Sequence, residues 1–176
     1  AVELAKKLET AKKEGKLPKV VIPVHFAGLP CDMKAIHALG QHYGFSIIED
    51  ACHALGARYY DEPTGNCRYS NITVFSFHPV KIITTGEGGM AMTNDPALSK
   101  TMRLLRSHGI TREPEDFINQ PDGPWYYEQQ MLGFNYRMTD IQAALGLSQM
   151  QNLENWIQKR RKLARRYFEA LAPELL

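Results

Sequence analysis

The spacing of apolar positions changes from segment to segment along this chain, which predicts strands and helices in alternation. Residues 20–26 and 46–49 form short apolar runs typical of buried strands. Between them, residues 33–43 carry apolar side chains at helical spacing, with Asp32 before them as an N-cap and Gly44 after them as a C-terminal residue. A strand, a helix and a strand at this spacing form a βαβ unit, whose strands run parallel. The predicted fold class is therefore α/β.

The rest of the chain adds elements of the same two kinds. Residues 2–15 predict an exposed helix, and residues 72–77 and 90–93 predict two further strands. Residues 95–106 open with Asp-Pro, a pair that suits a helix N-cap and first turn. Residues 139–171 open with the Thr-x-x-Gln spacing of a capping box and continue in a helical pattern, so we expect one long helix there.

A long segment rich in glycine and proline, residues 108–133, separates these two helices. It contains the aromatic cluster Trp125, Tyr126 and Tyr127. Long loops of compact domains are usually functional or disordered, and the aromatic residues favour a functional loop. The alternative is a surface flap that packs on its own aromatic side chains.

Composition and charge narrow the class of protein. The net charge of +2 is small and no long run of like charge occurs, so no nucleic-acid partner is expected. The three cysteines form no Cys-x-x-Cys pair, which favours a reducing cytoplasm. No apolar run has the length of a membrane span, and the first residues lack the apolar core of a signal peptide. The six histidines fall into no zinc-binding spacing, so no metal site is expected.

Three residues near predicted strand ends could together bind pyridoxal 5'-phosphate. This cofactor requires a lysine, an acid beside its pyridine nitrogen, and donors to its phosphate. Lys81 follows one strand, Asp50 ends another, and Ser76 lies in the first of these. In open parallel sheets, ligands bind beyond the carboxyl ends of the strands. Taken singly, however, Asp50 suits a capping residue and Lys81 a solvent-facing loop lysine.

Several long segments resemble one enzyme family, the DegT/StrS group of sugar aminotransferases. These segments are EDACHALG, FSFHPVKIITTGEGGMAMTND, LLRSHGI and GFNYRMTDIQAALG. The resemblance implies part of the large domain of a fold-type-I aminotransferase, with a mostly parallel sheet and flanking helices. It also implies a homodimeric enzyme that uses pyridoxal phosphate to transaminate a nucleotide-linked 4-keto-6-deoxy sugar, with glutamate as the amino donor.

The resemblance also implies a role for each matching residue. Lys81 is the Schiff-base lysine and Asp50 the partner of the pyridine nitrogen, while His53 lies against the cofactor ring or its phenolic oxygen. Ser76 holds the phosphate, and Asn135 reaches the phosphate from a second subunit, so the active sites are shared. Arg137 is a candidate contact for an anionic substrate group, since a guanidinium suits phosphates, although an arginine at a helix entry is equally typical.

Two parts of the family pattern are not found in this sequence. One is an N-terminal turn that contacts the phosphate, and the other is a small C-terminal domain over the substrate. We therefore expect a fragment, with residues 1–138 as part of the cofactor-binding large domain and residues 139–176 as a long helix that leads toward the small domain. Full activity is not expected of this chain alone.

Two alternative functions remain open at this stage. One is a non-catalytic scaffold or regulator on the same fold, against which the presence of both Lys81 and Asp50 argues. The other is a sugar dehydratase of the same group, in which a histidine stands in place of the lysine. Ser76, His78 and Asp50 could also suggest a hydrolase triad, but the Gly-x-Ser-x-Gly turn is absent.

Overall fold

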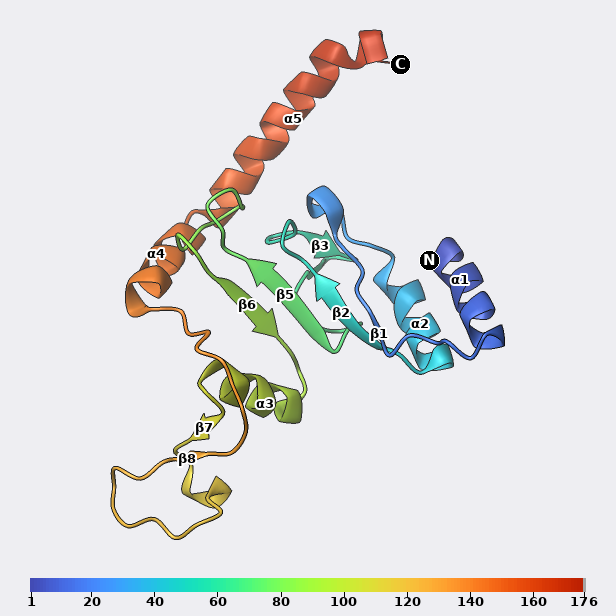
Figure 1. The fold of residues 1–176 in the computed structure, drawn as a ribbon. Helices are drawn as coiled ribbons and strands as arrows, with labels where there is room; N and C mark the ends of the chain where they lie inside the picture. Colours follow the sequence, from blue (N-terminus) through green and yellow to red (C-terminus); the bar gives the residue numbers. More distant parts are fainter. Residues whose placement is uncertain (176) are drawn as a thin grey trace.

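The computed structural model describes residues 1–175, which form a four-stranded sheet with helices around it (Figure 1). The strand order is β1-β2-β5-β6, where β1–β2 and β2–β5 are parallel and β5–β6 is antiparallel. The predicted α/β class with a mostly parallel sheet is thus confirmed. The strands of this sheet are β1 (Val20–Val21), β2 (Ser46–Asp50), β5 (Ile72–Ser76) and β6 (Gly89–Met92).

The remaining elements flank this sheet or extend from it. Two small antiparallel pairs occur, β3–β4 and β7–β8. The helices are α1 (Val2–Lys13), α2 (Met33–Tyr43), α3 (Pro96–Arg106), α4 (Asp140–Met150) and α5 (Leu153–Leu175), with short 3-10 turns η1 (Phe26–Gly28) and η2 (Pro114–Asp116); the small strands are β3 (Arg58–Tyr59), β4 (Glu62–Pro63), β7 (Ile110–Thr111) and β8 (Glu128–Gln129). Among residues 1–175, no helix has both the length and the apolar character needed to cross a bilayer.

The predicted helix ends are confirmed by their hydrogen bonds. The Asp32 side chain accepts from Ala35 N at the start of α2, and Gly44 ends that helix at φ 78°. Asp95 accepts from two backbone N–H groups at the start of α3. Thr139 and Gln142 form the expected capping box of α4. These local patterns are readable from sequence because each involves residues within one helical turn.

Two predicted elements differ from the structure: one strand is shorter, and one helix is divided into two. In the predicted strand 20–26 the regular ladder with β2 is limited to β1, because Pro23 has no N–H to donate to a neighbouring strand; beyond it, Val24 forms an isolated bridge with Asp50. Ala27 and Gly28 then adopt positive φ values of 52° and 84°, which end the extended run. The single long helix predicted for residues 139–171 is wrong: α4 and α5 are separate helices, and Asn152 stands directly before α5, where asparagine is favoured over a helix interior.

Two apolar clusters form the core. The first packs α1 and α2 against β2 through Leu8, Met33, Ile36, Phe45 and Ile47. The second lies at the carboxyl ends of β2 and β5 and contains Ala51, Ala54, Phe75, Phe77 and Ile83, with Trp156 of α5 packed against it. This second cluster fixes the backbone on which Asp50 and Lys81 are carried.

The segment after α3 forms a lobe that stands apart from the main sheet (Figure 1). Residues 110–129 of this lobe include β7 and β8, and its centre is the buried side chain of Glu128. Glu128 accepts hydrogen bonds from Ile118 N, Asn119 N and the hydroxyl of Tyr126. Of the three aromatic residues of the predicted cluster, Tyr126 contacts Phe117 edge to face and donates to Glu128, whereas Trp125 is 72% and Tyr127 54% exposed.

Candidate active site

Asp50 ends β2 at the carboxyl edge of the parallel strands. Its backbone N donates to Pro23 O at 3.0 Å, and its backbone O accepts from His25 N at 3.0 Å. On the other side of the strand, Ala51 N donates to Val74 O at 2.9 Å. Hydrogen bonds to both neighbouring segments fix the main chain at this point, so the Asp50 carboxylate leaves the sheet from a defined position.

The environment of Asp50 favours its ionised form. Oδ1 accepts from Cys52 N at 3.1 Å. A hydrogen bond from the Cys52 side chain contributes most to lowering the pKa of Asp50, partial burial opposes it, and the charges of His53 and Lys81 lower the pKa further. A carboxylate with a lowered pKa is negatively charged at neutral pH and can bind a protonated ring nitrogen.

Lys81 lies in the loop that follows β5, between the buried side chains of Phe77 and Ile83. Its backbone N donates to His78 O at 2.9 Å, which closes a tight turn. The Lys81 side chain is half-buried, and its charge is near enough to lower the pKa of Asp50. The two residues thus follow adjacent parallel strands: Asp50 ends β2, and Lys81 lies in the loop after β5.

Ser76 and His53 lie at the same edge. Ser76 is the last residue of β5, and its Oγ accepts from His78 N at 3.4 Å. The exposed ring of His53 lies near Phe26, with 6.0 Å between the ring centroids, and its Nδ1 accepts from Ala27 N at 3.4 Å. Four of the six predicted site residues therefore gather where β2 and β5 end.

Asn135 and Arg137 lie elsewhere in the chain. The segment that carries them pairs with the end of α3, where Phe134 N donates to Leu105 O and Tyr136 N donates to Arg106 O. Both side chains are exposed. The segment is paired with the end of α3, where Ser107 bridges Asn135, and further along it Met138 packs against the core cluster that contains Phe75.

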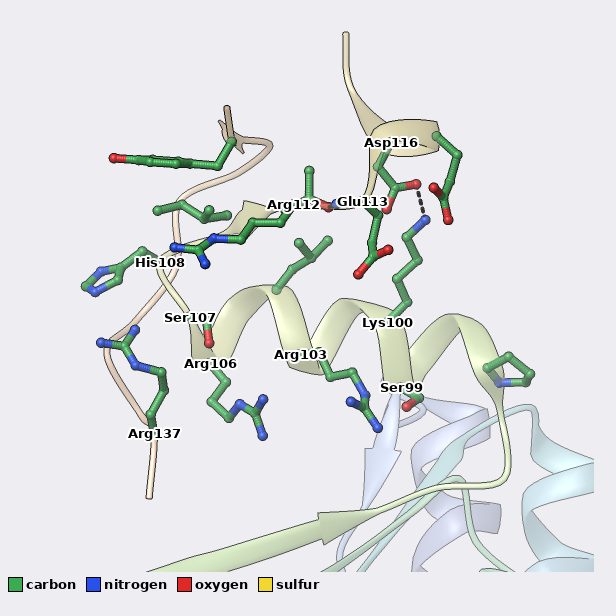
Figure 2. A pocket seen from close by; sticks show the side chains of 16 residues that line it. Ser99, Lys100, Arg103, Arg106, Ser107, His108, Arg112, Glu113, Asp116 and Arg137 are labelled. Atoms are coloured by element: carbon green, nitrogen blue, oxygen red, sulfur yellow. Dashed lines mark hydrogen bonds and ion pairs between the residues drawn. The ribbon is translucent and has the colours of Figure 1, made fainter. Parts of the chain in front are cut away.

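Arg137 instead lines a groove of about 990 Å³ between α3 and the lobe (Figure 2). The basic side chains of this groove are Lys100, Arg103, Arg106, His108, Arg112 and Arg137. Lys100 pairs with Asp116, whereas Arg103, Arg106 and Arg137 form no ion pair with any side chain that the structure describes. The end of the groove near Arg106 and Arg137 is therefore suited to an anionic group.

Three residues of this region were not selected from the sequence. Cys52 contacts the Asp50 carboxylate, and burial together with that contact raises the pKa of its thiol to about 11. Glu49 and His25 form a buried pair behind Asp50. One signal for this pair was available: Glu49 shares a face of its strand with the apolar Ile47, and a carboxylate on a buried face requires a partner.

Comparisons with known proteins identify the family and the fold. The sequence model of the DegT/DnrJ/EryC1/StrS aminotransferase family matches residues 2–174. The spore coat polysaccharide biosynthesis protein SpsC of Bacillus subtilis is 40% identical over 149 residues, which are 85% of this chain and 38% of SpsC.

Solved structures of similar proteins share the fold. PseC of Helicobacter pylori, an aminotransferase involved in pseudaminic acid biosynthesis, has a TM-score of 0.78 at 35% identity, over 89% of this chain and 39% of PseC. The putative sugar aminotransferase Spr1654 of Streptococcus pneumoniae, in its PLP form, has a TM-score of 0.72 at 30% identity, over 88% of this chain and 41% of Spr1654. The chain spans about two fifths of the length of these relatives.

Proposed function

The chain belongs to the DegT/DnrJ/EryC1/StrS aminotransferase family, and we propose that it forms the cofactor-binding part of a transaminase for a nucleotide-linked 4-keto-6-deoxy sugar. The observation that carries this proposal is the placement of Asp50 at the end of β2 and of Lys81 in the loop after β5, because these two strands are adjacent and parallel. The intact lysine favours transamination over the dehydratase alternative.

The residues at this edge fit pyridoxal phosphate. An amine, an ionised carboxylate and a hydroxyl are the donor set that the cofactor requires, and Lys81, Asp50 and Ser76 supply them. The PLP form of Spr1654, a protein of similar fold, supports the same cofactor for this chain. When bound, pyridoxal phosphate supplies a ring that accepts the electrons released as an amine loses its α-proton.

Each side chain would then have a defined role. Lys81 Nζ would hold the cofactor covalently and, once released, would accept and return the substrate proton as general base and acid. The Asp50 carboxylate would keep a proton on the ring nitrogen by charge, because its lowered pKa leaves it ionised at neutral pH. Ser76 Oγ would donate to the phosphate, and the exposed ring of His53 would lie against the cofactor ring or its phenolic oxygen.

The phosphate end of the site is proposed to require a second subunit. The segment with Asn135 is hydrogen-bonded to the end of α3 and is not paired with the strands that carry Lys81. Asn135 is exposed, which leaves its amide free to contact a neighbouring chain. This arrangement supports a homodimer with shared active sites, in which each chain completes the site of the other across a two-fold axis.

The substrate is proposed to be a UDP-linked sugar of the pseudaminic acid route, with glutamate as amino donor. Two segments, GNCRYSNITVFSFHPVK and PWYYEQQMLGFNYRMTD, resemble the transaminase that makes UDP-4-amino-4,6-dideoxy-N-acetyl-altrosamine. The similarity to PseC supports the same substrate class. The basic end of the groove near Arg137 is suited to the phosphates of such a nucleotide.

Borohydride reduction of the full-length protein with added pyridoxal phosphate tests the covalent role of Lys81. We expect the cofactor to be fixed on one peptide, that of Lys81, and no adduct to form in Lys81→Ala. Lys100→Ala is the matched control, because Lys100 is an exposed lysine paired with Asp116 in the groove, and its adduct should be normal. An adduct on a different lysine would refute the assignment.

Subunit mixing tests the shared site. Asn135→Ala and Lys81→Ala chains, each inactive alone, should regain activity when mixed, because one site of each heterodimer then has both residues. If heterodimers form, as verified with differently tagged chains, and no activity returns, Asn135 acts within its own chain and the shared-site proposal is wrong.

A further inference from the structure

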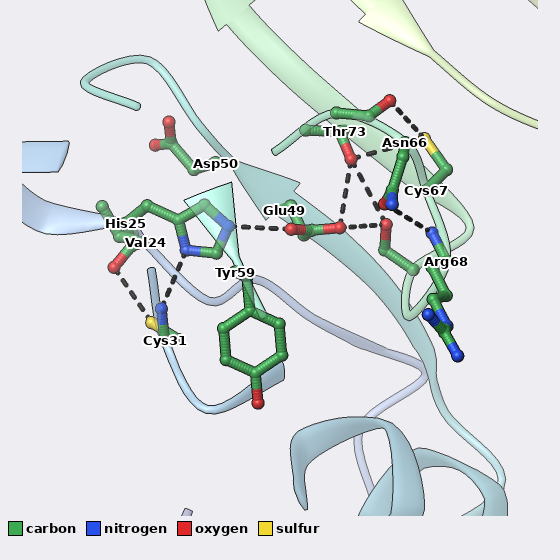
Figure 3. A network of polar contacts seen from close by, with 12 residues as sticks. Val24, His25, Cys31, Glu49, Asp50, Tyr59, Asn66, Cys67, Arg68 and Thr73 are labelled. Atoms are coloured by element: carbon green, nitrogen blue, oxygen red, sulfur yellow. Dashed lines mark hydrogen bonds and ion pairs between the residues drawn. The ribbon is translucent and has the colours of Figure 1, made fainter. Parts of the chain in front are cut away.

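A buried polar network lies directly behind Asp50 (Figure 3). His25 is 0% exposed, Glu49 6% and Thr73 0%. They come from three neighbouring segments of the sheet: the residues after β1, the strand β2, and the strand β5. Burial of a carboxylate among apolar strands is costly, so this network has to be fully hydrogen-bonded to persist.

The hydrogen bonds fix the role of every atom in the pair. Cys31 N donates to His25 Nδ1 at 3.2 Å, and a backbone N–H can only donate, so Nδ1 is an acceptor. His25 Nε2 therefore carries the ring proton and donates to Glu49 Oε2 at 2.8 Å. Glu49 Oε1 accepts from the hydroxyls of Ser70 and Thr73. The carboxylate thus receives three hydrogen bonds inside the protein.

These bonds keep Glu49 charged despite its burial. Burial alone raises the pKa of Glu49, but the hydrogen bonds from His25, Ser70 and Thr73 together outweigh it, and the net pKa is lowered. Every polar atom of the network has a partner; Thr64 Oγ1 is the one buried side-chain oxygen or nitrogen, among the side chains that the structure describes, that lacks one.

The network is joined to Asp50 through the main chain. The β1–β2 ladder stops at Val21, and the two segments pair again only where Val24 bridges Asp50. His25 N donates to Asp50 O at this bridge, and the His25 side chain returns to Glu49, the residue before Asp50. Consecutive strand residues point to opposite faces. Glu49 therefore points into the network while Asp50 points toward the candidate site.

We propose that the buried His25–Glu49 pair is a positioning device for Asp50: it holds the end of β2 so that the Asp50 carboxylate meets the ring nitrogen of the cofactor. This inference rests on the proposed role of Asp50 in binding pyridoxal phosphate. Neither His25 nor Glu49 touches the cofactor, and both act through the main chain of Asp50. A displacement of about 1 Å in an aligned group can lower the reaction rate on the order of a hundredfold, so the position of Asp50 is expected to affect activity.

The test compares Glu49→Gln with Glu128→Gln in the full-length protein. Glu128 is a matched control, since it is also a buried carboxylate with several donors, but it lies in the lobe. Hydrogen-bond partners of metal ligands are worth about 10- to 100-fold in affinity. By analogy, we expect Glu49→Gln to weaken binding of pyridoxal phosphate about tenfold, measured by absorbance titration, and Glu128→Gln to leave it unchanged.

A second readout needs no cofactor. The pKa of the Cys52 thiol is raised to about 11, mainly by burial and in second place by the hydrogen bond with the Asp50 carboxylate. If Glu49→Gln displaces Asp50, Cys52 should be alkylated faster at pH 8, as it should be in Asp50→Asn. Combining Glu49→Gln with Asp50→Asn should add no further change in either readout, because the support then has nothing left to position.

Each failure has its own signature. If Asp50→Asn weakens cofactor binding but Glu49→Gln weakens it no more than Glu128→Gln does, the positioning proposal is wrong and the proposed function stands. The same holds if the two changes at Glu49 and Asp50 are additive. If Asp50→Asn has no effect on cofactor binding, the proposed function itself fails. Should Glu49→Gln not fold, Thr73→Val removes one donor to Glu49 and is judged by the same criteria.

Discussion

Replacing Gly28 by alanine should disturb the candidate site through one main-chain contact. Gly28 has a φ of 84°, and a Cβ added there would lie 2.9 Å from the backbone oxygen of His53. The left-handed conformation costs a residue with a Cβ about 1–2 kcal/mol. The contact with a main-chain oxygen cannot be relieved by a side-chain rotation, and overpacking of this kind costs about 1–3 kcal/mol more. We therefore expect a total loss of about 2–5 kcal/mol.

Gly44→Ala separates the two contributions. Gly44 has a similar φ of 78°, but a Cβ there would have no atom within 4 Å. This variant should lose only the conformational part, about 1–2 kcal/mol. Urea unfolding of the full-length proteins, followed by circular dichroism, measures both losses. Titration with pyridoxal phosphate should show weaker binding only in Gly28→Ala, because only that change shifts the His53 backbone.

Two results with these variants would contradict the predicted effect of Gly28→Ala. Equal stability losses in Gly28→Ala and Gly44→Ala would mean that the backbone at His53 moves away from the added Cβ at no cost in free energy. A larger stability loss in Gly28→Ala with unchanged cofactor binding would mean that the segment of His53 does not contribute to the site.

Three further predictions concern a helix cap, a thiol and a buried acid. Asp95→Ala should destabilise α3 by about 1 kcal/mol, because two backbone N–H groups lose their acceptor. Thermal unfolding measures this, with Asp122→Ala as the control because Asp122 is an exposed aspartate outside the helices. Cys52, with a pKa of about 11, should react with iodoacetamide at pH 8 far more slowly than in the urea-unfolded protein, and equal rates would contradict its contact with Asp50. The hydrogen bond from the Tyr126 hydroxyl and those from neighbouring N–H groups outweigh burial and lower the pKa of Glu128 from 4.5 to about 2. The stability that ionised Glu128 contributes is therefore complete above pH 4.5 and is lost as the pH falls toward 2. Limited proteolysis of the lobe should increase over that pH range in the native protein but not in Glu128→Gln.

Local features of the fold could be predicted because each depends on neighbouring residues. The N-caps Asp32 and Asp95, the glycine at position 44 and the capping box at Thr139 all act within one helical turn, and all have the predicted hydrogen bonds or backbone conformation. The strand predictions were less complete. Apolar character alone does not show that Pro23 interrupts the ladder or that the chain turns at Ala27.

In the candidate site, too, the residue types could be predicted from the sequence, whereas their arrangement depends on the fold. Lys81, Asp50 and Ser76 could be selected from sequence because their chemical types suit one cofactor and because each lies in or after a predicted strand. That their two strands are adjacent, and that Lys81 is near enough to influence Asp50, depends on strand order. Strand order is a property of the whole sheet, and no local pattern in the sequence specifies it.

Sequence by itself therefore determined the fold class, the capped helix ends and the residue types of a cofactor site, since periodicity, capping and side-chain chemistry are local properties; it missed the break between α4 and α5. Only the tertiary structure showed that Glu49 is paired with His25, which is 24 positions away, and that the segment of Asn135 is paired with the end of α3. A buried carboxylate needs a hydrogen-bond partner, and which residue becomes that partner depends on which segments pack against each other and exclude water. That arrangement exists only after the strands and helices have packed.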